Sequence, residues 1–425
     1  MNVLLIGSGG REHALAYKIS ESPNLTKLYC APGNPGIADY AELLELDLSN
    51  FNQVLEFCNS NRIELVVIGP EQPLVDGLGS HLRENGINVF GPDKEAAMIE
   101  GDKAFSKDLM LKYNIPTADY KVFTKESKND VLTYLEVTSY PVVIKASGLA
   151  AGKGVAICED RKSTEATLHD YFEDNIFGES GHTIVIEEFL KGEEASIFVI
   201  TDGDDYMILP SSQDHKRALD GDKGKNTGGM GAYAPAPIVT DELLKRVEKD
   251  IIVPTLEGLK NEGKKYNGCL YCGLMIDNGI PKVVEFNCRF GDPETQVVLP
   301  LLKGDFLKLL YSAAIGKINK EAIKYEEGTS VCVVAASKGY PDKYEKSVEI
   351  SGLETKLENA IVFHAGTKRL DDKIVTNGGR VLGITSFISK NDLKQAKQIA
   401  YDALSKIHFD GITYRTDIAD KALKN

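Results

Sequence analysis

Four short apolar runs lie in the first part of the chain, and each ends at a glycine- or proline-rich turn. They cover residues 3–6, 28–30, 65–68 and 88–90, and helix-like segments separate them. Apolar strands that alternate with helices predict a parallel sheet built from βαβ crossovers. Such sheets bind ligands at the carboxyl ends of their strands, where these turns lie. Residues 1–101 are therefore predicted to form a Rossmann-like α/β domain with a ligand site on its turns.

The pattern changes after this first part. A helical segment at 103–113 comes first, and strand-like runs then cover residues 141–145, Val155–Cys158, 183–189, 196–201, 273–277 and 282–286. Consecutive strands joined by short glycine turns favour antiparallel pairing. Asn278-Gly279 is the strongest short-range hairpin signal in this region, but the following Ile280-Pro281 predicts a loop longer than two residues.

The last part of the chain predicts a small α+β domain. Strand-like runs there cover residues 330–335, 347–350, 361–365 and 380–384, and a helical segment covers 393–407. A chain of 425 residues corresponds to about three domains at roughly 150 residues each. We therefore predict domains over residues 1–101, 102–325 and 326–425.

Composition excludes several classes of protein. Lys and Arg total 49 against 63 Asp and Glu, so the net charge is −14. Such a charge disfavours binding to nucleic acid or to an anionic membrane. No apolar run approaches the length of about 18 residues that a membrane helix needs, and the N-terminus lacks the basic region of a signal peptide. The seven scattered cysteines favour reduced thiols and a cytoplasmic location.

The turn after the first strand, Gly7-Ser8-Gly9-Gly10, opens a predicted helix. Backbone N–H groups at such a turn can approach an anion, and the helix N-terminus favours negative charge. The dinucleotide fingerprint is incomplete, because Glu12 occupies its third glycine position and the second strand ends without an acidic residue. We therefore expect a phosphate monoester here and not a nicotinamide cofactor; a purely structural turn is the alternative.

A second glycine-rich loop, residues 148–154, follows the strand that ends at Lys145. It is not a P-loop, because the spacing from Gly148 to Gly152 is one residue too short and Gly154 replaces the metal-binding Ser or Thr. The loop also leads into a strand, where a P-loop requires a helix. The pattern predicts a mobile loop that folds over phosphates and excludes water; a flexible surface turn is the alternative.

Glu285-Phe286-Asn287 is the sharpest candidate for a metal site. Strand alternation places Glu285 and Asn287 on one face of the strand. Two hard oxygen ligands suit Mg²⁺, which prefers one or two protein oxygens together with phosphate and water. The nearby Arg289 supplies a guanidinium suited to developing phosphoryl charge. An exposed polar strand face is the alternative.

Three further polar segments are weaker candidates. The run 183–189 ends in a carboxylate cluster that continues to Glu194, where backbone groups can contact an adenine edge and a carboxylate can bind ribose hydroxyls. Segments 212–217 and 226–233 are polar and glycine-rich without periodicity, as in functional loops. Within the former, the triplet His215-Lys216-Arg217 beside Asp214 is typical of an anion site next to an amine-binding carboxylate. Solvated charged segments are the alternative for all three.

Together these segments resemble the ATP-grasp superfamily and, within it, closely resemble the phosphoribosylamine–glycine ligase family. The resemblance extends over nearly the whole chain. Its strongest stretches are GGREHALA, APGNPG, GPEQPLVDGL, GLAAGKGV, EEFLKGEEAS, SQDHKR, NTGGMGAY, EFNCRFGDPETQ, FHAGT and NGGRVL. It implies that residues 102–325 form the ATP-grasp domain, with a lid at about residues 120–190.

The resemblance also implies roles for individual residues. The ATP-binding set comprises Lys103, Lys145, Gly152, Lys153, Gly154, Glu187, Glu188, Phe189, Leu190, Glu193, Met275 and Glu285. The substrate-binding set comprises Gly9, Gly10, Glu12, Pro32, Gly33, Asn34, Glu71, Asp214, Lys216, Arg217, Gly228, Gly229, Arg289 and Asp292. The catalytic set comprises Lys145, Arg289, Asp214 and Asp292, and the ligands of Mg²⁺ or Mn²⁺ are Glu285 and Asn287.

One departure from the superfamily concerns the metal. Many ATP-grasp enzymes carry a second acidic ligand on the neighbouring hairpin strand. That strand reads Gly273-Leu274-Met275 here, and Asp277 lies only near the turn. The sequence therefore leaves open how many carboxylates hold the metal.

The implied reaction joins glycine to 5-phosphoribosylamine at the expense of ATP, through a glycyl phosphate intermediate. Its products are glycinamide ribonucleotide, ADP and phosphate, as in de novo purine biosynthesis. Another ATP-grasp ligase or carboxylase with a different acceptor is one alternative, and a nonenzymatic nucleotide sensor on the same scaffold is another. The sequence does not determine the oligomeric state, and a monomer is compatible with it.

Overall fold

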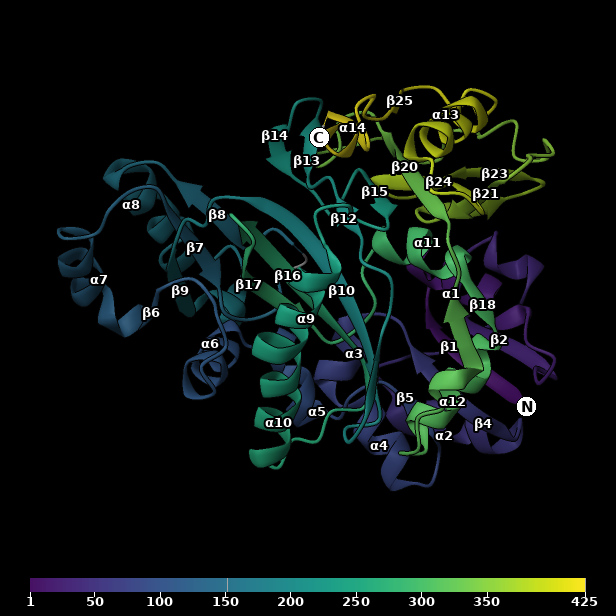
Figure 1. Ribbon diagram of the computed structural model, residues 1–425, viewed down its shortest axis with the longest axis horizontal. Helices are drawn as coiled ribbons and strands as arrows, with labels where there is room; N and C mark the ends of the chain where they lie inside the picture. The colour runs from purple at the N-terminus through teal and green to yellow at the C-terminus, as the bar shows by residue number, and fades with distance from the viewer. Residues whose placement is uncertain (151, 425) are drawn as a thin grey trace.

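The computed structural model describes residues 1–150 and 152–424. Ala151, within the second glycine-rich loop, lies outside the described residues. Figure 1 shows a parallel α/β unit at the N-terminus, a central antiparallel sheet, a lid that projects from it, and a C-terminal α+β unit above the N-terminal one. This multidomain α/β and α+β architecture confirms the predicted fold class.

The N-terminal sheet has the order β3-β2-β1-β4-β5, and its pairings are parallel. The strands are β1 (Asn2–Gly7), β2 (Lys27–Pro32), β3 (Glu42–Leu43), β4 (Ile63–Ile68) and β5 (Val89–Phe90). The helices are α1 (Gly10–Ser20), α2 (Phe51–Ser60), α3 (Glu71–Asp76), α4 (Leu78–Glu84) and α5 (Lys94–Gly101). The carboxyl ends of β1 and β2 meet where Gly33 N–H donates to the Gly7 carbonyl at 3.0 Å, so the predicted turns share one edge of the sheet.

The lid is a four-stranded antiparallel sheet in the order β6-β9-β7-β8. Its elements are β6 (Tyr120–Thr124), α7 (Lys128–Leu135), β7 (Val142–Ala146), β8 (Val155–Cys158), α8 (Arg161–Phe172) and β9 (Thr183–Glu188). Both helices pack on the face that carries Ile144 and Ile186. Since side chains alternate along a strand, Lys145 and Glu187 lie on the opposite face.

The central sheet has the order β11-β10-β16-β17 and is antiparallel. Its strands are β10 (Glu193–Thr201), β11 (Tyr206–Ile208), β16 (Gly268–Asp277) and β17 (Ile280–Asn287). The helices of this part are α6 (Lys103–Lys112), α9 (Asp241–Val247) and α10 (Val253–Asn261). Within the described part of the chain, every helix is too short or too polar to cross a lipid bilayer.

The predicted long loop between β16 and β17 is wrong. Asp277 pairs with Ile280 and Ile276 with Pro281, so the turn has only two residues. Asn278 and Gly279 have φ values of 48° and 73°, the left-handed conformations that a tight type I′ hairpin turn requires. Proline is compatible with this arrangement because β17 is an edge strand.

The C-terminal sheet has the order β12-β15-β20-β24-β21, with β25 paired to β20. Its strands are β12 (Gln213–Asp214), β15 (Gly231–Ala234), β20 (Thr329–Ser337), β21 (Ala360–His364), β24 (Arg380–Ile388) and β25 (Ile412–Thr413), and α13 (Leu393–Leu404) packs on it. Other elements of this half are β13 (Arg217–Leu219), β14 (Lys223–Asn226), α11 (Glu294–Val298), β18 (Leu302–Gly304), α12 (Phe306–Ala314), β19 (Ile323–Tyr325), β22 (Thr367–Leu370), β23 (Lys373–Thr376) and α14 (Asp420–Lys424).

Two predictions in this half are wrong. The polar segments 212–217 and 226–233 are not irregular throughout, because they contain the strand β12, the first residue of β13, the last residue of β14 and the first three residues of β15. Their polar residues pair with each other or with β20, so backbone pairing outweighs the lack of an apolar pattern. Residues 347–350 form only an isolated bridge at Glu349, and Ser347 has a φ of 63°, which interrupts an extended strand.

The helix α6 offers a matched test of the central core. Leu109 on this helix is 3% exposed and packs in the core beneath the central sheet, whereas Leu111 is 69% exposed. We expect Leu109→Ala to lower the free energy of unfolding by about 2–5 kcal/mol through lost burial and cavity formation. Leu111→Ala should change it by about 0.5 kcal/mol or less. Urea unfolding followed by circular dichroism measures both, and equal midpoints for the two variants would contradict this account of the core.

Candidate functional site

A cleft of about 880 Å³ separates the lid sheet from the central sheet and continues toward β12 and β13. In Figure 1 the lid strands β7 to β9 lie beside β16 and β17 of the central sheet. Predicted residues that line the cleft are Lys145, Gly152, Glu187, Glu188, Phe189, Leu190, Glu193, Asp214, Lys216, Arg217, Gly228, Met275, Glu285, Asn287, Arg289 and Asp292. A recess beside it is lined by Glu71, Lys103 and Gly154 together with several of the same residues.

Lysine side chains converge on one buried carboxylate at the inner end of the cleft. Lys145 Nζ lies 3.0 Å and Lys107 Nζ 3.2 Å from Glu187 Oε2. Lys145 also donates to the Val284 carbonyl at 2.9 Å, which ties the lid to β17. Burial lowers the pKa of Lys107 to about 8, and the nearby carboxylate of Glu187 opposes this shift.

Lys107 was missed at the sequence level, although a signal for it exists. It follows Lys103 by four residues on α6, and residues with this spacing lie on one face of a helix. Lys103 itself donates through Nζ to the Gly148 carbonyl at 3.2 Å. The helix therefore presents two lysines toward the glycine-rich loop and the cleft.

Glu285 and Asn287 have the geometry of a metal site. They lie on one face of β17, opposite Gly273 and Tyr271 of β16. Among the described residues, no side chain or backbone group makes a hydrogen bond or ion pair with the Glu285 carboxylate. Burial alone would raise its pKa, but Lys216, Lys145 and other nearby cations lower it, so Glu285 is an anion with free oxygens. A carboxylate and an amide oxygen in this position fit Mg²⁺.

The neighbouring strand β16 supplies no carboxylate opposite Glu285 and Asn287. Asp277 is exposed at the far end of β16, four residues from Gly273 and thus about 13 Å along the strand. Glu294, which sequence analysis did not single out, lines the cleft and accepts a hydrogen bond from Tyr271 Oη at 3.0 Å. The sequence signal for Glu294 is its position within the motif GDPETQ.

Arg289 is held by two acidic side chains. Its guanidinium lies 3.1 Å from Glu71 and 2.8 Å from Glu100, and it donates to Asn287 Oδ1 at 3.2 Å. Burial opposes its charge, but Glu100 and Glu71 raise its pKa well above the ordinary value. Burial would raise the pKa of Glu71, but Arg289, Arg11 and hydrogen bonds together lower it to about 2. The arginine is thus a fixed cation beside Asn287.

Asp214 and Lys216 form the charged floor of the outer cleft. Lys216 Nζ lies 2.8 Å from Glu194. Burial opposes the charge on Lys216, but Glu194 and Asp214 raise its pKa well above the ordinary value. Burial raises the pKa of Asp214, with Lys216 acting in the opposite direction. A positively charged ligand group near Asp214 would favour its ionised form.

Arg217 and the strand end at β9 complete the cleft. Arg217 donates to the Gly224 carbonyl of its own hairpin at 2.9 Å. Phe189 is 37% exposed, and Glu188 forms an ion pair with Lys282 at 2.7 Å. An apolar side chain and carboxylates therefore lie together where β9 passes into β10.

The N-terminal turn residues form a separate group beside the cleft. Gly9, Gly10, Glu12, Pro32, Gly33 and Asn34 gather at the carboxyl ends of β1 and β2, and none of them lines the cleft. Glu12 Oε2 accepts from Gly9 N–H at 2.6 Å, so this carboxylate caps the turn. Arg11 Nη1 donates to the Phe290 carbonyl at 3.0 Å, which packs the turn against the segment that carries Arg289 and Asp292.

Two further predicted residues also lie outside the cleft lining. Lys153 is exposed on the glycine-rich loop, and its N–H donates to the Ala150 carbonyl at 2.9 Å. Gly229 is buried against Pro293 beside Gly228, which does line the cleft.

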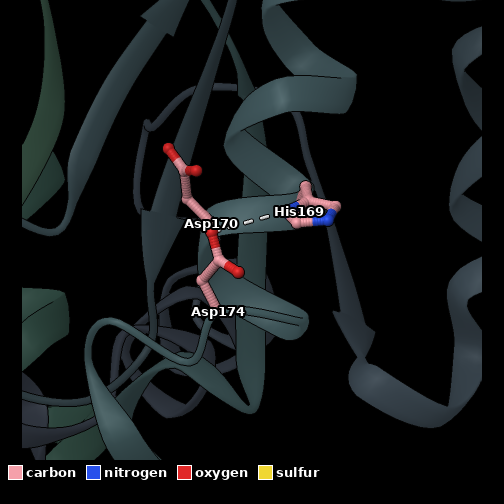
Figure 2. A group of neighbouring side chains, drawn as sticks. All are labelled: His169, Asp170 and Asp174. Atoms are coloured by element: carbon pink, nitrogen blue, oxygen red, sulfur yellow. Dashed lines mark ion pairs between the residues drawn. The ribbon is translucent and has the colours of Figure 1, made fainter.

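A group of potential metal-binding side chains lies on the outside of the lid. His169, Asp170 and Asp174 stand at the end of α8, all three exposed, and His169 Nδ1 lies 3.5 Å from Asp174 (Figure 2). It is the one such cluster found within the described ranges. None of the three lines the cleft, and an exposed acidic cluster alone does not define a metal site.

Models of the three domains of phosphoribosylglycinamide synthetase match the chain in order. The N domain matches residues 1–100, the ATP-grasp domain residues 101–295 and the C domain residues 330–421. A phosphoribosylamine–glycine ligase from Leptospira interrogans is 49% identical over 100% of this chain and 99% of its own length. A second, from Caldanaerobacter subterraneus, is 46% identical over 99% of each chain.

Solved structures agree with these sequence relationships. The phosphoribosylamine–glycine ligase of Thermotoga maritima has a TM-score of 0.83 and 36% identity, and the match covers 99% of this chain and 100% of that one. The biotin carboxylase domain of a Hydrogenobacter thermophilus 2-oxoglutarate carboxylase shares the fold at 17% identity, with a TM-score of 0.73 over 97% of this chain and 91% of that one. The chain therefore belongs to the phosphoribosylglycinamide synthetase family of ATP-grasp ligases.

Proposed function

We propose that this chain joins glycine to 5-phosphoribosylamine, with ATP as the energy source, and releases glycinamide ribonucleotide, ADP and phosphate. One structural observation supports this proposal in addition to membership of the family. The cleft gathers Lys145, Arg289 and the pair Glu285 and Asn287, which are the groups that phosphoryl transfer to a carboxylate requires.

A free carboxylate must be activated before an amine can form an amide with it. In the proposed first step a glycine carboxylate oxygen attacks the γ-phosphorus of ATP, which gives glycyl phosphate and ADP. Lys145 and Lys103 bind the phosphate oxygens, and Arg289 stabilises charge on the transferred group. The fixed cations of the site position the reactants and stabilise the charge on the phosphoryl oxygens, so this step is catalysed by positioning and electrostatics.

In the second step the amine of 5-phosphoribosylamine attacks the acyl carbon. The new C–N bond replaces the C–O bond to phosphate, phosphate leaves, and the amine loses a proton. Asp214 and Asp292 are the proposed partners of the two amino groups, because both line the cleft. The turn Gly9-Gly10 with Pro32, Gly33 and Asn34 holds the phosphoribosyl group, supported by its position beside the Asp292 segment.

Glu285 and Asn287 are the proposed ligands of Mg²⁺ or Mn²⁺. A bound divalent cation supplies neutralising charge to the triphosphate. Lys216, Arg217 and Gly228 then face the substrate side of the cleft, while Glu187, Phe189, Leu190, Glu193 and Met275 form the proposed adenosine site.

The lid has a chemical purpose in this scheme. Acyl phosphates hydrolyse, so water must be excluded while the intermediate exists. The loop that carries Gly152, Lys153 and Gly154 joins β7 to β8 at the edge of the cleft, and we propose that it closes over the phosphates.

We also propose a cytoplasmic location without nucleic-acid or membrane partners, supported by seven unpaired, buried cysteines and the negative net charge.

Lys145→Ala tests the phosphoryl-transfer step. We expect kcat to fall by about 100- to 1000-fold, the usual loss when one preorganised electrostatic contact is removed. The fold should survive because Lys107 still pairs with Glu187. Lys121→Ala, at an exposed lysine on β6 of the same lid, is the matched control and should retain full activity. Near-normal turnover in a folded Lys145→Ala variant would remove this residue from the mechanism.

Glu285→Gln tests the metal site, because it keeps the shape of the side chain and removes its charge. The Mg²⁺ concentration for half-maximal ATP binding, measured by calorimetry, should rise by about tenfold or more. Asp277→Asn, on the same hairpin but exposed at its far end, should leave that value unchanged. An unchanged Mg²⁺ dependence in Glu285→Gln would contradict the assignment.

The substrate pair is tested by ADP release with glycine and 5-phosphoribosylamine supplied separately and together. Rapid ADP release with both, together with formation of the amide product, is the expected result. ADP release with a different acceptor would favour another ATP-grasp ligase. ATP binding without turnover under any of these conditions would favour a nucleotide sensor.

A further inference from the structure

An arginine of the C-terminal unit reaches the rim of the cleft without lining it. Arg380 begins β24, and its Nη1 donates to the Gly228 carbonyl at 2.6 Å and to the Asp292 carbonyl at 2.7 Å. The same nitrogen lies 3.4 Å from the Asp292 carboxylate. The guanidinium therefore joins two cleft-lining segments that are 64 residues apart (292 − 228) in the sequence.

The Gly228 segment is held from the same side by a second residue. Gly228 N–H donates to Tyr340 Oη at 3.1 Å. A Cβ atom at Gly228 would lie 2.9 Å from Cζ of Arg380, closer than real Cβ contacts allow. The backbone of Gly228 and the guanidinium are thus in direct contact, and a side chain at this position would separate them.

The carboxylate of Asp292 has a defined orientation because several groups hold it. Gln296 Nε2 donates to Oδ1 at 2.8 Å, on the oxygen that also faces Arg380. Burial would raise the pKa of Asp292, but Arg380 and Arg11 outweigh it and lower the pKa. The other oxygen, Oδ2, lies 3.4 Å from the position that a Cβ on Gly9 would occupy, so it faces the N-terminal turn.

We propose that Arg380 is a positioning residue that sets Asp292 and the Gly228 segment for binding of 5-phosphoribosylamine. This inference rests on the proposed function, and it assigns the C-terminal unit a part in the substrate site. Arg380 acts through Asp292 and Gly228, because it does not line the cleft. Its contacts are with Gly228 and Asp292, which we assign to the substrate and not to adenosine.

The chain offers a matched control for this proposal. Lys225 and Asp342 form an ion pair at 2.7 Å between the same two regions, but both side chains are more than 60% exposed, and neither lines the cleft. Such surface pairs contribute little to stability. Lys225→Ala therefore removes a link between these regions without altering the positions of Asp292 and Gly228.

The test compares steady-state constants for each substrate in the full-length enzyme. Arg380→Ala should raise KM for 5-phosphoribosylamine by about 10- to 100-fold, the loss that removal of charged hydrogen bonds produces, and should change KM for ATP by less than about twofold. Arg380→Lys should restore part of the loss, since an ammonium retains the charge but not the planar geometry. Lys225→Ala should match the parent enzyme.

Three results would overturn the proposal: equal rises in both KM values, constants in Arg380→Ala that match the parent, or a lowered melting temperature with unchanged KM. If Arg380→Ala does not fold, Arg380→Lys tests the proposal in its place. A selective rise in its KM for 5-phosphoribosylamine supports the proposal, and parent-like constants overturn it. A parent enzyme without ligase activity would refute the proposed function itself, which is a distinguishable outcome.

Discussion

Two sheets face each other across the cleft, and both direct charged or polar side chains into it. Lys145 and Glu187 project from the lid, while Glu285 and Asn287 project from β17. The hydrogen bond from Lys145 to the Val284 carbonyl joins the two sheets at the inner end of this space, and the ion pair with Glu187 fixes Lys145 within the lid sheet. Burial makes each charge costly unless it has a partner, so the position of every charged group depends on the others.

This constraint explains how a chain with a net charge of −14 can bind phosphates. The cations are concentrated in one cleft, and acidic partners such as Glu71, Glu100 and Glu194 hold them in place. Net charge governs long-range attraction to polyanions, whereas a small phosphorylated ligand responds to the groups that it contacts. The overall acidity and the cationic cleft are therefore compatible.

Local patterns were sufficient to predict much of this structure. The parallel order of the N-terminal strands follows from their apolar runs and turns, and strand alternation alone placed Glu285 and Asn287 on one face. Lys107, Glu100 and Arg380 were missed because their importance comes from partners that are distant in sequence, such as Glu187, Arg289 and Asp292. The hairpin error had the opposite origin. Pro281 predicted a longer loop because proline disfavours a central strand, and only the sheet order shows that β17 is an edge strand.

The proposed reaction depends most on transfer of the γ-phosphoryl group of ATP to the glycine carboxylate, and an isotope experiment tests this transfer directly. Glycine labelled with ¹⁸O in its carboxylate is supplied with ATP, Mg²⁺ and 5-phosphoribosylamine, and the released phosphate is analysed by mass spectrometry. Attack on the γ-phosphorus followed by displacement at the acyl carbon predicts that one labelled oxygen per turnover appears in phosphate. Phosphate without the label, formed together with the amide product, would contradict the proposed intermediate.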